Sequence, residues 1–158
     1  MKKIIILIIF LGNFAVFSQS ENSELNVFSF EEVEQLHQQK PKPIVVYIYT
    51  DWCKICFGMK KNAFLNDEII KLLNDKFYFI NLNGEEKKDI TFLGKTFVYK
   101  PSGNKTGTHE LAKELASIKG RFSYPTTTIL NSNFEIEAQI DGYLNSKKFY
   151  KLINNYIK

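Results

Sequence analysis

The sequence predicts a single domain of the α/β class, in which helices flank a central β-sheet. Segments with helical periodicity alternate with short apolar or β-branched runs typical of strands, in the order α, β, α, β, insert, α, β, β, α. A Cys-x-x-Cys pair directly follows one strongly apolar run. The chain has 158 residues, and 140 remain without the N-terminal segment 1–18, enough for one domain with a proper core.

Residues 1–18 have the pattern of a signal peptide. A short segment with two lysines is followed by an apolar run at 4–17, and Ser18 supplies the small residue before a cleavage point. The run is shorter than the roughly 20 residues needed to span a bilayer, although an uncleaved membrane anchor is an alternative. We therefore expect export to the periplasm, an N-terminal extension at 19–27 and a domain at 28–158.

The charge pattern gives no indication of a nucleic-acid partner. The formal charge of +4 falls to +2 when the two lysines of the first segment are removed, and the sequence has no basic stripe. Aromatic residues make up 15% of the chain and are scattered through the predicted strands. We expect them in the core rather than stacked on bases.

A capping box predicts the first helix. Ser29 is placed as the N-cap and Glu32 lies three residues later, so the helix should run from Phe30 to about Gln39, where two prolines follow. The continuous apolar run at 44–49 predicts a central strand that is buried on both faces.

The chain's only two cysteines, Cys53 and Cys56, follow that strand and open a predicted helix at 53–62. At a helix N-terminus, unpaired NH groups and the helix dipole favour a thiolate, so Cys53 is the predicted nucleophile. Cys56 lies one turn later, where its sulfur can attack a mixed disulfide, and is the predicted resolving thiol. Lys54 adds a positive charge that should lower the pKa of Cys53.

Three other interpretations of the cysteine pair are open. A structural disulfide would close a loop too short to remove much chain entropy. A zinc site needs four ligands, and the chain offers only His37 and His109 besides the cysteines, with His109 expected to face solvent. An inactive relic would leave a domain used only for binding. We expect redox chemistry, with no metal and no organic cofactor.

The remaining framework elements follow from caps and apolar spacing. Asn66 caps a helix with one apolar face, and 76–82 is the next strand. Near the C-terminus, 126–130 is a β-branched strand and 134–140 alternates as a strand with one solvated face. Ser146 then caps a final amphipathic helix.

The insert at 85–119 has a less regular pattern. It contains a possible short strand at 97–99 and a segment, 101–107, whose composition is that of a loop. Thr108 then caps a predicted helix that Gly120 closes.

The chain resembles the thioredoxin family over 28–158. The matching residues are Trp52 with the Cys-x-x-Cys pair after a strand, the Ser-Tyr-Pro-Thr segment at 123–126, and Gly142 after the last strand. It is most similar to periplasmic thioredoxin-like proteins and to the C-terminal domains of DsbD-type reductases. The resemblance implies a thioredoxin fold with a central mixed sheet, and thiol-disulfide exchange in the reductive direction. Its partners would be proteins with disulfides and a membrane or periplasmic thiol-disulfide electron donor, and we expect a monomer.

The resemblance also implies a substrate groove. Pro125 would follow a cis peptide bond and face the cysteines, so that the backbone of Tyr124 can pair with an extended substrate segment. Trp52 and Tyr124 would form aromatic walls of the groove, and Thr126 would lie beside them. An oxidase, an isomerase or a noncatalytic binding module would use the same surface, and these alternatives are open.

The sequence departs from the family pattern in two places. Tyr47 stands six residues before the first cysteine, where the family commonly has a buried aspartate that serves as base for the second thiol. A phenol with an ordinary pKa near about 10 is a poor base, and Asp51 is a candidate in its place. The insert at 85–119 either shapes partner choice or covers the sheet edge.

Overall fold

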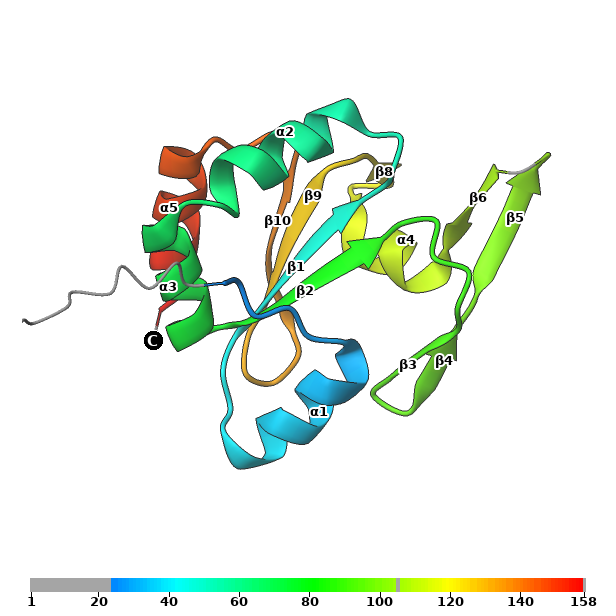
Figure 1. The fold of residues 1–158 in the computed structure, drawn as a ribbon. Coiled ribbons are helices and arrows are strands. Elements are labelled where there is room, and N and C mark those ends of the chain that lie inside the picture. Colours follow the sequence, from blue (N-terminus) through cyan, green and yellow to red (C-terminus); the bar gives the residue numbers. More distant parts are fainter. Residues whose placement is uncertain (1–23, 105, 158) are drawn as a thin grey trace, which may run out of the picture.

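Figure 1 shows the computed structural model of the chain, which describes residues 24–104 and 106–157. The predicted signal peptide at 1–18 lies outside these residues, as does the first part of the predicted extension at 19–27. The fold is α/β, with a four-stranded sheet in the order β10-β9-β1-β2. Its strands are β1 (Ile44–Tyr49), β2 (Tyr78–Asn83), β9 (Thr126–Leu130) and β10 (Ile136–Asp141).

The central strand β1 places the two cores of the domain. It pairs in parallel with β2 and antiparallel with β9, which in turn pairs antiparallel with β10, so the sheet is mixed. Successive side chains of a strand point to opposite faces. Val46 and Ile48 therefore pack into one core, and Val45 and Tyr47 into the other, all fully buried. The sequence prediction of a strand buried on both faces is confirmed.

Helices cover both faces of this sheet (Figure 1). The face that carries Val45 and Tyr47 is covered by α2 (Lys54–Ala63), α3 (Asp67–Lys76) and α5 (Ser146–Asn154). The opposite face is covered by α1 (Phe30–Gln39) and α4 (Glu110–Ala116).

Helices α1 and α3 begin where capping chemistry predicts. Ser29 and Glu32 form the predicted capping box of α1, and Asn66 caps α3. The prediction for α5 is wrong by one residue, because the side chain of Asn145 accepts the capping hydrogen bond at 2.9 Å. The hydroxyl of Ser146 instead donates to a backbone carbonyl of α2, so it fastens α5 to α2.

Two predicted strand boundaries shift for local reasons. The strand predicted at 76–82 begins at Tyr78, because α3 continues through Lys76. The strand predicted at 134–140 begins at Ile136, because Phe134 has a positive φ of 63° in the preceding turn.

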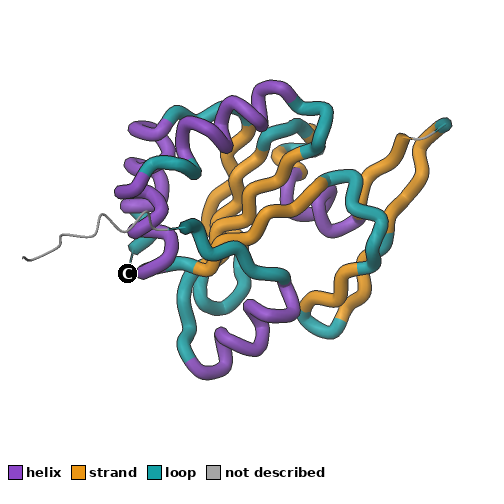
Figure 2. The backbone as a smooth tube through the Cα atoms, viewed as in Figure 1, coloured by secondary structure: helices purple, strands orange, loops and turns teal. Residues whose placement is uncertain are grey.

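The insert is a pair of hairpins rather than a loop. The first joins β3 (Ile90–Phe92) to β4 (Lys95–Phe97), and the second joins β5 (Tyr99–Gly103) to β6 (Thr106–His109). Figure 2 shows both extending beyond the central sheet, with which they do not pair among the described residues. The loop predicted at 101–107 is therefore wrong, and the short strand predicted at 97–99 is divided between the end of β4 and the start of β5.

The composition of β5 and β6 explains the error. Both strands contain residues that normally form turns, and only their pairing makes them a ladder. Gly107 is required there, because a Cβ at this position would collide with the ring of Tyr99 and the backbone of Lys100. A single sequence does not reveal that cross-strand contact.

Helix α4 also differs from its prediction at both ends. His109, not Thr108, is the N-cap, since its Nδ1 accepts from the backbone NH of Leu111 at 3.3 Å. This histidine is fully buried, so its expected exposure is wrong. At the other end α4 stops at Ala116, and a short hairpin of β7 (Ser117–Ile118) and β8 (Arg121–Phe122) follows.

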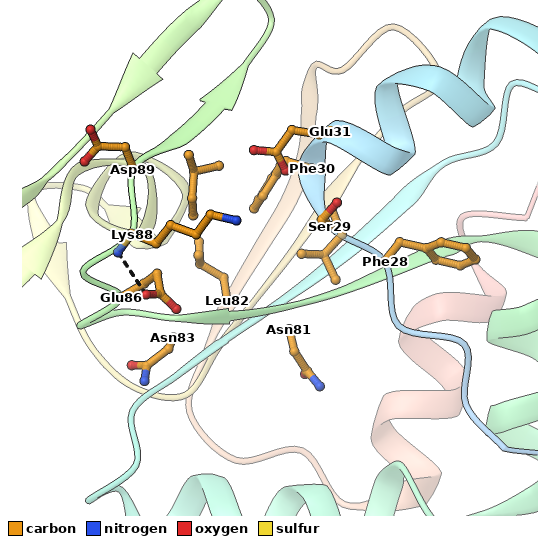
Figure 3. Close-up of a pocket in the computed structure, with 12 residues that line it drawn as sticks. Phe28, Ser29, Phe30, Glu31, Asn81, Leu82, Asn83, Glu86, Lys88 and Asp89 are labelled. Atoms are coloured by element: carbon orange, nitrogen blue, oxygen red, sulfur yellow. Dashed lines mark hydrogen bonds between the residues drawn. The ribbon is translucent and has the colours of Figure 1, made fainter.

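The outer edge of β2 is partly covered by the segment before α1. Val27 forms a parallel bridge with Phe79, and the backbone NH of Phe28 donates to the carbonyl of Phe79 at 2.9 Å. Figure 3 shows a pocket of about 160 Å³ beside this contact. It lies between the first turn of α1, the end of β2 and the loop that holds Glu86 and Lys88, and neither cysteine lines it.

Candidate functional site

The cysteines form a disulfide at the point where β1 leads into α2. Cys53 and Cys56 are joined through their sulfur atoms, with their Cα atoms 5.2 Å apart. Cys53 is the N-cap of α2, and its Sγ accepts a hydrogen bond from the backbone NH of Cys56 at 3.1 Å. The predicted position of the first cysteine at a helix N-terminus is therefore confirmed. The helix itself begins at Lys54, one residue later than expected.

The two cysteines differ in accessibility. Cys53 is 8% exposed, whereas Cys56 is 1% exposed. Around them Trp52, Ile55 and Phe57 are 65%, 59% and 60% exposed, an apolar rim beside the disulfide. An incoming thiolate or disulfide therefore reaches Cys53 more easily than Cys56.

The loop before α2 is tied to the end of β2. Asp51 accepts a hydrogen bond from the side-chain amide of Asn83 at 3.1 Å. The backbone NH of Cys53 donates to the carbonyl of Thr50 at 3.2 Å, which turns the chain from β1 into α2. These contacts hold the cysteine pair at the carboxyl end of the two parallel strands.

The peptide bond between Tyr124 and Pro125 is cis, as the family resemblance implied. The carbonyl of Pro125 accepts from the backbone NH of Gly142 at 2.8 Å, which joins this loop to the end of β10. Thr126 is fully buried, and its hydroxyl donates to the carbonyl of Ser123 at 2.8 Å. Thr126 therefore shapes the loop, with its side chain turned away from solvent.

Tyr124 packs between the site and the insert. Its ring lies edge-on to Trp52, with 5.9 Å between ring centroids, and edge-on to Phe122 at 4.9 Å. A Cβ on Gly84 would collide with the hydroxyl end of this ring, so Tyr124 covers the first residue after β2. Burial, reinforced by the charge of Glu85, raises the pKa of Tyr124 to about 12. Tyr124 is thus a neutral, half-buried support under the exposed Trp52.

Tyr47 is buried beneath α2. Its hydroxyl donates to the backbone carbonyl of Cys56 at 3.0 Å, and its ring meets Phe64 edge-on at 4.8 Å. Burial, followed by the neighbouring Tyr49, raises the pKa of Tyr47 above its ordinary value. A phenol in this state donates a hydrogen bond and does not accept a proton from a thiol at neutral pH.

A family profile described as "Thioredoxin-like domain" matches residues 30–157. The chain belongs to the thioredoxin-like family. The four strands of the sheet, both cysteines and the cis proline all lie within the matched residues.

Solved structures show the same fold for this thioredoxin-like domain. A DsbH oxidoreductase has a TM-score of 0.61 at 14% identity, covering 92% of this chain and 93% of its own. A thioredoxin from Thermus thermophilus has a TM-score of 0.59 at 18% identity, covering 84% and 86%. The reduced DsbD C-terminal domain of Neisseria meningitidis has a TM-score of 0.52 at 16% identity, covering 80% and 91%.

Two curated relatives match parts of the chain. The Caenorhabditis elegans protein "Uncharacterized protein B0495.5" is 34% identical over 74 residues, which cover 47% of this chain and 10% of the relative. The mouse protein "Spermatogenesis-associated protein 20" is 33% identical over 61 residues, 39% of this chain and 8% of the relative. The matched region thus spans a tenth or less of each relative.

Sequence reasoning missed the cleft beside the disulfide. This cleft of about 80 Å³ is lined by both cysteines, Asp51 and Lys60, together with Tyr49, Thr50 and Phe57. The Nζ of Lys60 lies 3.1 Å from the centroid of the Tyr49 ring. Burial lowers the pKa of Lys60, while the charge of Asp51 opposes that shift. The available signal was the four-residue spacing from Cys56 to Lys60, which places both on one helix face.

The histidines lie away from the cysteines. His37 lies in α1 and His109 is the N-cap of α4, and both helices cover the opposite face of the sheet. Within residues 24–104 and 106–157, no three His, Cys, Asp or Glu side chains are grouped to hold a metal ion.

No helix of this same part of the chain has the length and apolar character needed to cross a bilayer.

Proposed function

We propose that this chain is a thiol-disulfide oxidoreductase that reduces disulfides in protein substrates. The observation that carries the proposal is a disulfide at the N-terminus of α2 whose first cysteine is the more exposed one. The backbone NH of Cys56 already donates to the Cys53 sulfur at 3.1 Å, and it would stabilise a thiolate there. The fold shared with a DsbH oxidoreductase and a DsbD C-terminal domain supports this activity.

The reaction begins with the reduced cysteine pair. The Cys53 thiolate attacks one sulfur of the substrate disulfide, and the other substrate sulfur leaves as a thiolate that takes a proton from water. The Cys56 thiolate then attacks the Cys53 sulfur in the mixed disulfide and releases the second substrate thiol. Two electrons pass to the substrate, and the Cys53–Cys56 disulfide of the structure is the product.

Substrate recognition is assigned to the surface around Cys53. Trp52 offers an exposed aromatic wall, and Tyr124 supports it from below. The Tyr124–Pro125 backbone would pair with an extended substrate segment, while Thr126 keeps the loop in shape. Lys54, exposed in the first turn of α2, would add positive charge next to the Cys53 thiolate.

The cellular setting is part of the same proposal. Residues 1–18 would direct export to the periplasm, where the chain would work as a monomer and a membrane or periplasmic dithiol donor would reduce the pair again. Mass spectrometry of the exported chain tests the first point. A mature N-terminus near residue 19 is expected, and an intact N-terminus on membrane-bound protein would contradict cleavage.

A trapping experiment tests the activity. With Cys56→Ser, the Cys53 thiolate attacks substrates but nothing resolves the adduct, so mixed disulfides should appear on a nonreducing gel. Cys53→Ser is the matched control and should give none. If neither adducts nor faster reduction of insulin disulfides is observed with the reduced protein, the domain is a binding module instead.

The reduction potential of the cysteine pair tests the direction. A value near that of thioredoxin, about −270 mV, agrees with a reductase. A value near about −120 mV would identify an oxidant and overturn the reductive direction.

A further inference from the structure

Resolution of the mixed disulfide poses a problem in this chain, because Cys56 must lose its proton while buried. Burial in apolar surroundings disfavours the charged form of a thiol. Tyr47 is committed as a hydrogen-bond donor to the carbonyl of Cys56 and does not act as the base. Asp51 lines the same cleft, but a carboxylate charge close to the sulfur disfavours a second negative charge there.

Among the residues that the structure describes, Lys60 is the one cationic side chain that lines this cleft with the cysteines. It lies four residues after Cys56 on α2, and long side chains in a helix point back toward its N-terminus. The contact with Tyr49 shows where the ammonium group is held, since that ring lies at the end of β1. Lys60 therefore extends toward the cysteines.

The charge of Lys60 is not neutralised by a close ion pair. The salt bridges among the described residues join Lys95 to Glu114 and Lys100 to Glu110, and Lys60 is in neither. The other ionisable groups near its ammonium are Asp51 and Tyr49, with Glu86 acting on Tyr49 from the loop after β2. An ammonium group over an aromatic ring keeps its positive charge.

We propose that the Lys60 ammonium group stabilises the Cys56 thiolate and so assists resolution of the mixed disulfide. This role rests on the proposed function. Lys60 would assist the second thiol in a chain that has Tyr47 at the position where the family commonly has a buried aspartate. The cleft is large enough for a water molecule, which would carry the Cys56 proton to solvent. The hydroxyl of Thr50 also lines it, buried and without a hydrogen-bond partner among the described residues.

The test measures the pKa of Cys56 directly, with Cys53→Ser as background so that a single thiol titrates. NMR of the Cys56 Cβ carbon follows its ionisation without any substrate. Lys60→Met should raise the pKa of Cys56 by about one unit, the lower end of what a close opposite charge contributes. Lys60→Arg keeps the charge and should restore the pKa.

Lys61→Met is the matched control. Lys61 is the next residue on α2 and carries the same charge, but its Nζ lies over the Phe57 ring, 4.8 Å from the centroid, and the residue does not line the cleft. Its replacement should shift the pKa of Cys56 much less. Equal shifts in the two variants, or no shift with Lys60→Met, would overturn the proposal. Lys60→Gln repeats the test if Lys60→Met fails to fold.

A kinetic measurement connects the pKa to the reaction. A rise of one unit leaves about tenfold less thiolate at neutral pH, and the greater nucleophilicity of a more basic thiol recovers part of that loss. Resolution of a preformed mixed disulfide should therefore slow about threefold in Lys60→Met and not in Lys60→Arg. Because the titration needs no substrate, absence of reductase activity would refute the proposed function without affecting the pKa result.

Discussion

The framework of the domain, which consists of the four-stranded sheet with α1, α2, α3 and α5, is held together differently from the insert at 85–119. In the framework, β1 packs against α1 on one face and against α2, α3 and α5 on the other, and the cysteines sit where β1 ends. In the insert, the β3–β4 and β5–β6 hairpins pair locally and form no ladder with the central sheet. The framework thus sets the position of the disulfide. The insert adds Ile90, Phe92 and Phe97 to the core on the opposite face of the sheet.

The largest difference between the two regions is expected in stability. Ile48→Ala removes a fully buried side chain from β1 and should lower the free energy of unfolding by about 2–5 kcal/mol. Thr96→Ala changes an exposed side chain of β4 and should cost about 0.5 kcal/mol or less. Urea unfolding followed by circular dichroism measures both. Similar losses would show that the insert is as integral to the fold as β1.

A smaller difference is expected from removing one hydroxyl in each region. Tyr47→Phe removes a buried hydrogen bond to the carbonyl of Cys56 and should cost about 0.5–1.5 kcal/mol of stability. Tyr99→Phe, in β5 of the insert, should change stability by about 0.5 kcal/mol or less.

The same Tyr47→Phe variant also tests the assignment of the base. Because its phenol donates to a backbone carbonyl, removing it should not abolish resolution of a mixed disulfide. A stopped-flow measurement of resolution that fell to the background rate would show instead that Tyr47 takes the proton.

The smallest expected effect is the pH dependence of the insert. Burial lowers the pKa of His109, although the backbone of Lys88 and the negative charge of Glu86 oppose the shift. A histidine whose pKa is depressed on folding binds protons more readily when unfolded, so stability is present above the unfolded value near about 6.5 and falls as the pH drops below it.

His109→Asn tests this dependence, because asparagine can still cap α4 but does not titrate. Urea unfolding of the variant should vary less between pH 7 and pH 5 than that of the original chain, within the range where the histidine titrates. An unchanged pH profile would assign the acid sensitivity to other groups.

The framework could be predicted from sequence because its signals are local and periodic. The capping box at Ser29, the apolar run of β1 and the cysteine spacing each specify structure over a few residues. The cis bond before Pro125 could not be derived in this way, and it came from the resemblance to a family. The parts of the site that could be predicted are therefore the Cys-x-x-Cys motif and the cis proline known from the family.

The insert and the cleft were missed because they depend on contacts between elements, which the pattern along a single element does not show. Gly107 is required because of its close fit against Tyr99 on the neighbouring strand, and His109 is fully buried although it ends a strand of turn-forming residues. In the sequence, nothing distinguishes Lys60 from its neighbour Lys61. The contact of Lys60 with Tyr49 depends on how α2 packs on β1, which no local pattern reveals.

The acidity of the Cys53 thiol gives the most direct test of the proposed chemistry. In the reduced Cys56→Ser variant, the rate of alkylation by iodoacetamide is measured across pH, so that only Cys53 reacts. A thiol that caps α2 should titrate below the ordinary value, within the range of about 3.5–7.5 that such positions give. Titration near about 8.5, as in a free cysteine, would contradict a catalytic role for Cys53 and leave only the thioredoxin-like fold.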